Sequence, residues 1–225
     1  MTTFVSIFLI FIVLLSMSIV SSEHPLSGIL QDIDTHLGKI TIRLIGDITR
    51  DKTPVICLPG INAALVDEWV RVAEHLSRHD HVVAIINFHS NSRTAPSSGI
   101  QSEDISRIIN EAVLLGVFHA EKGIIMGKSW GGHAAFAYTT NHPESVIKLV
   151  LVAPAYSNAP RVAALHQTGV HTFLAWTKDD PMIKYPTSEV WIENMGSDLV
   201  FYTAEKGGHT ILDEYTDPIM HFLNT

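Results

Sequence analysis

The 225-residue chain has a single cysteine, and this scarcity limits how its fold is stabilised. One thiol cannot form an internal disulfide, so stability must come from a full hydrophobic core. Cys57 stands in the apolar stretch PVICLPG, which favours a buried small hydrophobe over a reactive thiol. The chain also has no Asn-x-Ser/Thr sequon and so gives no sign of N-glycosylation.

Clusters of positive charge are absent as well. Lys and Arg total 15 against 23 Asp and Glu, and the net charge is −8 with neutral histidines. A surface that binds a nucleic-acid duplex needs clustered Lys and Arg, so we expect no nucleic-acid partner. There are 13 histidines, but no His/Asp/Glu group has the spacing of a zinc enzyme. We therefore expect neither a metal nor a cofactor.

The one long hydrophobic run lies at the N-terminus. Residues 4–20, FVSIFLIFIVLLSMSIV, are apolar apart from serines, and small residues follow as at a signal cleavage site. No Lys or Arg occurs before Lys39, so no positive charge opposes translocation. We expect residues 1–22 to be a signal peptide, with an uncleaved anchor over 4–20 as the alternative. Either route places residues 23–225 in the secretory pathway, secreted or lumenal, and only the anchor would give a membrane contact.

The rest of the chain alternates between short β-rich runs and longer helical patterns. The expected strands are 39–46, 54–60, 81–88, 122–127, 147–155, 170–177 and 198–205. The expected helices are 65–78, 102–118, 131–141, 187–195 and 213–223. Several strands are continuously apolar, which is typical of strands buried on both faces of a parallel sheet. We predict a single α/β domain over 23–225, with a doubly wound, mostly parallel sheet and helices on both faces.

A glycine-rich break follows the apolar run at residues 122–127. It reads Gly127-Lys128-Ser129-Trp130-Gly131 and leads at once into a helical pattern. In a strand–turn–helix setting, the two glycines let the strand and the helix pass closely, and the serine oxygen is exposed at the end of the sheet. This interpretation makes Ser129 a candidate nucleophile; the alternative is an ordinary glycine-rich loop with a buried serine.

A serine nucleophile needs a base, and the base needs an orienting carboxylate. Asp179 and Asp180 directly follow the expected strand 170–177, and His209 follows the last expected strand. Because the carboxyl ends of parallel strands meet at one edge of a sheet, this order brings serine, aspartate and histidine together. Taken alone, Asp-Asp-Pro also reads as a turn, and His209 as a loop histidine.

The motifs GKSWGG, KDDPM and GGHTIL together resemble the α/β-hydrolase superfamily, and the resemblance covers most of residues 39–225. It implies that Ser129 is the nucleophile, His209 the base and Asp180 the acid. Asp180 is preferred because acids of this family often directly precede Pro-x-hydrophobic; Asp179 stays open as the alternative.

The resemblance also implies an oxyanion hole formed by the backbone N–H groups of Ile61 and Trp130. Two departures from the family pattern stand nearby. Pro59 replaces the usual histidine, and Asn87 stands where many relatives have an aspartate. The second departure puts the local geometry of the loop after Asn87 in doubt.

Only residues 156–170 separate two neighbouring strands where many relatives insert a helical lid, so we expect minimal or no lid. An open site suits short-chain or bulky esters, thioesters or a protein-borne acyl group. Trp130 and Phe88 are candidates to line an acyl pocket, or else ordinary core aromatics. We expect a serine hydrolase that cleaves an ester or thioester, with carbon–carbon bond hydrolysis left open. The alternative is a non-catalytic or slow-turnover ligand-binding protein on the same fold.

Overall fold

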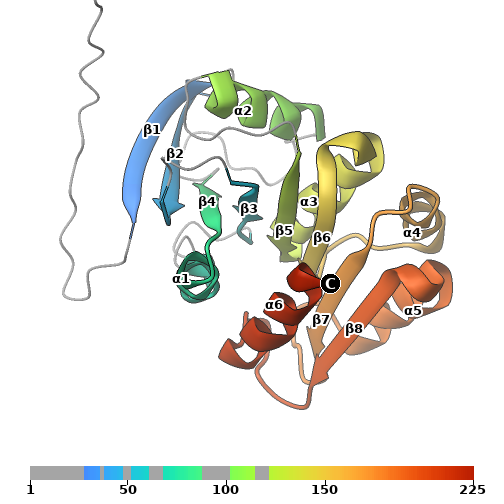
Figure 1. Cartoon of the computed structure of the whole chain (residues 1–225). Helices are drawn as coiled ribbons and strands as arrows, with labels where there is room; N and C mark the ends of the chain where they lie inside the picture. Colours follow the sequence, from blue (N-terminus) through green and yellow to red (C-terminus); the bar gives the residue numbers. More distant parts are fainter. Residues whose placement is uncertain (1–27, 36–37, 48–51, 61–67, 88–101, 115–121) are drawn as a thin grey trace, which may run out of the picture.

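The computed structural model describes residues 28–35, 38–47, 52–60, 68–87, 102–114 and 122–225 (Figure 1). Its strands are β1 (Ile29–Thr35), β2 (Gly38–Ile45), β3 (Pro54–Leu58), β4 (Val82–Asn87), β5 (Gly123–Lys128), β6 (Val146–Val152), β7 (Thr172–Thr177) and β8 (Leu199–Ala204). Its α-helices are α1 (Val70–Arg78), α2 (Ser102–Leu114), α3 (Ser129–Asn141), α4 (Ala159–His166), α5 (Glu189–Met195) and α6 (Thr216–Asn224). Short 3₁₀ turns are η2 (Pro143–Ser145), η3 (Tyr185–Ser188), η4 (Gly196–Asp198) and η5 (Asp213–Tyr215).

All eight strands form one sheet in the order β1-β2-β4-β3-β5-β6-β7-β8. β2 pairs antiparallel with both β1 and β4, and every other pair is parallel. The predicted fold class is therefore confirmed. The six parallel strands β3 to β8 all end at the same edge of the sheet, where ligands bind in doubly wound folds.

Each face of the sheet carries its own hydrophobic core, because successive strand residues point to opposite faces. Ile56 and Leu58 of β3 belong to the core under α2, α3, α4 and α5, whereas Val55 and Cys57 belong to the core under α1 and α6. Figure 1 shows these two helix layers on either side of the sheet. Cys57 is fully buried, and burial raises the pKa of its thiol well above the usual range.

The structure differs from the expected elements in several places. β1 was not expected: its sequence, ILQDIDT, is polar, and it is an edge strand held through pairing with β2. β6 ends at Val152 rather than at 155, because Ala153 adopts a positive φ of 42°. α3 begins at Ser129 rather than at residue 131. A short helix, α4, lies within residues 156–170, where minimal or no lid was expected.

Some expectations concern residues outside the described ranges. These are the signal or anchor segment 1–22, the oxyanion donor Ile61 and the pocket candidate Phe88. Within the described ranges, no helix combines the length and apolar character needed to cross a membrane. No group of three or more His, Cys, Asp or Glu side chains there is arranged to hold a metal ion.

Candidate active site

Ser129 lies at the sharp turn between β5 and α3, with a φ of 54°. A positive φ is unfavourable for a residue with a Cβ and costs about 1–2 kcal/mol. The surrounding backbone holds this conformation, because the Ala155 N–H donates a hydrogen bond of 2.9 Å to the Ser129 carbonyl. The strained serine is half-buried at the carboxyl end of β5 and is the first residue of the helix.

The two glycines of the motif are required by close backbone contacts. A Cβ on Gly127 would lie 2.4 Å from the Gly131 carbonyl oxygen. A Cβ on Gly131 would lie 2.1 Å from the Leu58 carbonyl oxygen and 2.4 Å from that of Pro59. All three distances are shorter than real Cβ contacts, so α3 approaches β5 and the end of β3 this closely only because both positions lack a side chain.

The carboxylate of Asp180 lies against the imidazole of His209. Its Oδ2 is 2.7 Å from His209 Nδ1, and its Oδ1 accepts hydrogen bonds from the N–H groups of Met182 (2.8 Å) and Ile183 (2.9 Å). Asp180 is 3% exposed, so these three hydrogen bonds replace water around the charge. A carboxylate fixed in this way orients the imidazole ring and selects the tautomer with its proton on Nδ1.

Asp179 has a different partner. Its Oδ1 accepts a hydrogen bond of 2.8 Å from the N–H of Gly208, and chiefly this bond lowers the pKa of the carboxyl. Thr177 donates a 2.5 Å hydrogen bond from its hydroxyl to the Gly208 carbonyl. The end of β7 therefore holds the loop that carries His209 through both backbone groups of Gly208, whose φ is 63°.

The loop after β3 reaches the serine from a third strand. A Cβ on Gly60 would lie 3.6 Å from the Cβ of Ser129, so Gly60 packs directly against the candidate nucleophile. The Gly60 N–H donates a 3.1 Å hydrogen bond to Oε2 of Glu68. The other oxygen of Glu68 accepts from Nζ of Lys128, in an ion pair whose side chains are 2% (Lys128) and 7% (Glu68) exposed.

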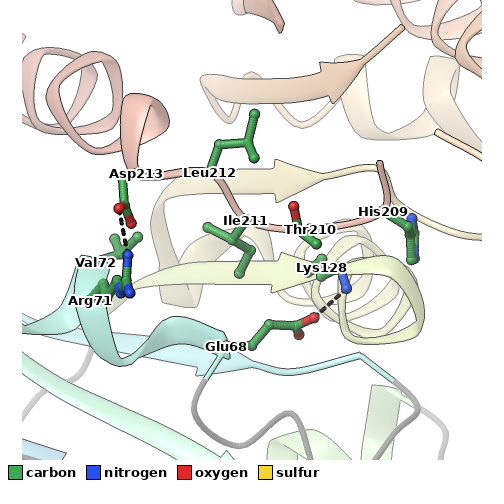
Figure 2. Close-up of a pocket in the computed structure, with 9 residues that line it drawn as sticks. All are labelled: Glu68, Arg71, Val72, Lys128, His209, Thr210, Ile211, Leu212 and Asp213. Carbon is green, nitrogen blue, oxygen red and sulfur yellow. Dashed lines mark hydrogen bonds and ion pairs between the residues drawn. The ribbon is translucent and has the colours of Figure 1, made fainter. Parts of the chain in front are cut away.

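A cavity of about 270 Å³ opens beside His209. Apolar side chains from α1 and from the segment after His209 line it, together with two ion pairs, Lys128–Glu68 and Arg71–Asp213 (Figure 2). The latter pair is open to solvent, with an N···O distance of 2.6 Å. His209 and Lys128 both line this cavity, and Lys128 directly precedes the candidate nucleophile Ser129 in the chain.

The side chains of Trp130 and His133, near Ser129 in the chain, both pack against other residues of the fold. Trp130 is 6% exposed and packs in the core on the α3 side, so its side chain is one of the ordinary core aromatics rather than the lining of an open pocket. His133, one turn after Ser129, contacts Arg161 through Nδ1 (3.3 Å) and the ring of Tyr156. Burial, and secondly the charge of Arg161, lower the pKa of His133 to about 4.

The structure thus brings Asp180 and His209 together and positions Ser129 on the turn that the glycines predict. Sequence reasoning missed Glu68, and it treated Lys128 only as a residue of the motif. The one signal for Lys128 was a charged residue at the end of a strand that is otherwise apolar. Nothing in the sequence pairs it with Glu68, which stands 60 positions earlier.

A family model described as the alpha/beta hydrolase fold matches residues 53–201. Several solved structures are similar to the chain. A predicted CIB-like hydrolase from Thermoplasma acidophilum has a TM-score of 0.70 at 17% identity, with 88% of this chain and 99% of that chain covered. Naproxen esterase from Bacillus subtilis has a TM-score of 0.69 at 12% identity, with 89% and 93% covered. The carboxylesterase CesB from the same organism has a TM-score of 0.69 at 13% identity, with 88% and 92% covered. No curated protein sequence matches the chain.

Proposed function

Because the chain belongs to the alpha/beta hydrolase fold family, we propose that it is a serine hydrolase that cleaves an ester or thioester through an acyl-enzyme. The observation that carries the proposal is the hydrogen bond between buried Asp180 and His209, at the sheet edge where Ser129 stands on its strained turn. Fold alone does not fix an activity, and this geometry is what supports a hydrolase over a binding protein.

In this mechanism Asp180 keeps the proton of His209 on Nδ1 and leaves Nε2 free of a proton. Nε2 removes the proton of the Ser129 hydroxyl as its oxygen attacks the substrate carbonyl. The same nitrogen then gives the proton to the leaving alkoxide or thiolate. Water repeats the sequence on the acyl-enzyme, releasing the acid and restoring Ser129. Asp180 stays ionised throughout and stabilises the imidazolium that forms.

The oxyanion of each tetrahedral intermediate needs two donors. We assign the backbone N–H of Trp130, in the first turn of α3, and that of Ile61, which follows Gly60 in the chain. The N-terminus of α3 adds a favourable dipole at the same point. Removing one such donor costs roughly 3 kcal/mol in other hydrolases, so the Ile61 loop matters as much as the acid.

Small-molecule esters are the substrate class that we propose. Two of the similar structures are named as esterases, and the triad chemistry requires an activated acyl carbon rather than a particular leaving group. The short α4 in place of a lid supports an accessible site. Thioesters fit the same chemistry, so a panel of both classes is the natural substrate screen.

Labelling with a fluorophosphonate probe tests the proposal, because the probe reacts only with an activated serine. We expect the purified protein to be labelled and the Ser129→Ala and His209→Ala variants to remain unlabelled. Hydrolysis of p-nitrophenyl acetate should follow the same pattern. A folded parent protein that neither reacts nor hydrolyses the ester would contradict the proposal and would favour the ligand-binding alternative.

A further inference from the structure

We propose that Glu68 is a positioning residue that fixes Gly60, two residues after the end of β3, against the nucleophile turn. The inference rests on the proposed function, because it concerns how the oxyanion site is built. Glu68 uses its two oxygens separately: Oε1 binds Lys128, the residue before Ser129, and Oε2 binds the N–H of Gly60. One carboxylate therefore ties two strand ends together.

The contacts leave little freedom at this point. The space for a Cβ on Gly60 is bounded by Glu68 Oε2 at 3.5 Å, Ser129 Cβ at 3.6 Å and Lys128 Nζ at 3.8 Å. Gly60 is thus enclosed by the serine, the lysine and the glutamate at once. Its N–H is committed to Glu68, so Gly60 itself is not an oxyanion donor. The bond fixes the Pro59–Gly60 peptide, one residue before the donor that we assign.

Because both charges are buried, Lys128 and Glu68 must pair with each other. Lys128 and Glu68 are nearly inaccessible to water, and burying an unpaired charge is far more costly than burying a pair. Each residue therefore keeps the other in place. An apolar pair could fill the same volume, but it would offer no hydrogen-bond acceptor to the Gly60 N–H. It would also make no directional contact that fixes the orientation of the side chain at position 68. The ion pair thus orients the carboxylate whose second oxygen holds the loop.

Two double variants separate the hydrogen bond from the charges. E68Q/K128M and E68L/K128M both remove the buried ion pair, and they differ in whether residue 68 offers an acceptor to the Gly60 N–H. We expect E68L/K128M to have a kcat for p-nitrophenyl acetate about 10- to 100-fold below that of E68Q/K128M, because a displaced oxyanion donor costs on this order. The two KM values should stay close to each other.

Stability and exchange measurements complete the test. Amide exchange of Gly60 should be slow in the parent and in E68Q/K128M, and fast in E68L/K128M. A matched control is K52M/D80N, which removes an ion pair at the opposite edge of the sheet and should leave kcat unchanged. The single variants E68L and K128M should unfold at lower temperatures than either double variant, since each leaves one buried charge unpaired.

Equal kcat and equal Gly60 exchange in the two folded double variants would overturn the proposal. Failure of the proposed function has a different signature. In that case the parent would not react with the fluorophosphonate probe, yet Gly60 exchange would still separate the two double variants. A kcat difference that appeared without an exchange difference would also count against Glu68 as a positioning residue.

Discussion

Gly131→Ala tests how closely α3 approaches the end of β3. The added methyl would lie 2.1 Å from the Leu58 carbonyl oxygen, 2.4 Å from the Pro59 carbonyl oxygen and 2.5 Å from the Leu58 carbonyl carbon. All three atoms belong to the backbone, so no side-chain rotation relieves the overlap. Either α3 or the loop after β3 must move by roughly 1 Å to restore an ordinary contact distance.

The cost follows from this required shift. Overpacking a closely packed core typically costs about 1–3 kcal/mol, and displaced backbone belongs at the upper end of that range. With about 3 kcal/mol lost, a protein of this size should unfold roughly 6–12 °C lower. Activity should fall by a comparable free energy, because the moving atoms adjoin Ser129 and Gly60. We expect a loss in kcat of about 100-fold.

Thermal unfolding and p-nitrophenyl acetate hydrolysis, measured on the same preparations, check both numbers. Gly169→Ala is the matched control, since a Cβ there meets no atom within 4 Å and only the φ of 69° opposes it. That change should cost about 1 kcal/mol and leave kcat unaltered. If Gly131→Ala unfolded no lower than Gly169→Ala, or kept the parent kcat, the close approach described here would be refuted.

Three further outcomes are expected. Asp180→Ala should lower kcat by about 10²–10⁴-fold, whereas Asp179→Ala should lower it far less, and the reverse order would make Asp179 the acid. Burial holds the pKa of His133 at about 4, against 6.5 for a free histidine. Between these two pH values the unfolded chain therefore binds one more proton than the folded protein does. The contribution of His133 to stability is complete above pH 6.5 and is lost as the pH falls toward 4. After a discount for the partial exposure of the ring, the free energy of unfolding should fall by about 1–2 kcal/mol over this pH range, as measured by chemical denaturation. A His133→Gln variant that lost as much stability over the same range would show that His133 is not the cause. N-terminal sequencing of protein secreted by a host should begin near Glu23 if residues 1–22 are a cleaved signal peptide, and an intact N-terminus in the membrane fraction would favour the anchor.

Much of the fold followed from local patterns in the sequence. Each of the seven expected strands occurs in the sheet, because each is a short β-rich run and several of them are continuously apolar, as buried parallel strands are. β1 escaped detection because an edge strand with one partner needs no apolar face, and its segment reads Ile29-Leu30-Gln31-Asp32-Ile33-Asp34-Thr35. α4 was not among the expected helices, since its eight residues give a weak periodic signal.

The candidate site was predictable where chain order alone determines proximity. Ser129, Asp180 and His209 each follow a parallel strand, and topology then gathers them at one edge. The Glu68–Lys128 pair could not be foreseen, because it joins a residue just before α1 to the end of β5 and depends on side-chain packing between two separate segments. Asp179 and Asp180 were likewise inseparable by sequence, since only the turn geometry decides which carboxylate faces the imidazole.

The buried thiol of Cys57 offers a way to detect opening of the folded protein. A thiol reacts with alkylating reagents through its thiolate, and burial keeps the Cys57 group both protonated and out of reach. The Cys57 side chain lies in the core between the sheet and helices α1 and α6, so it becomes accessible only when this helix layer moves away from the sheet or the protein unfolds. The rate at which a thiol reagent modifies the folded protein therefore measures how often this side of the core opens under native conditions, without any introduced label.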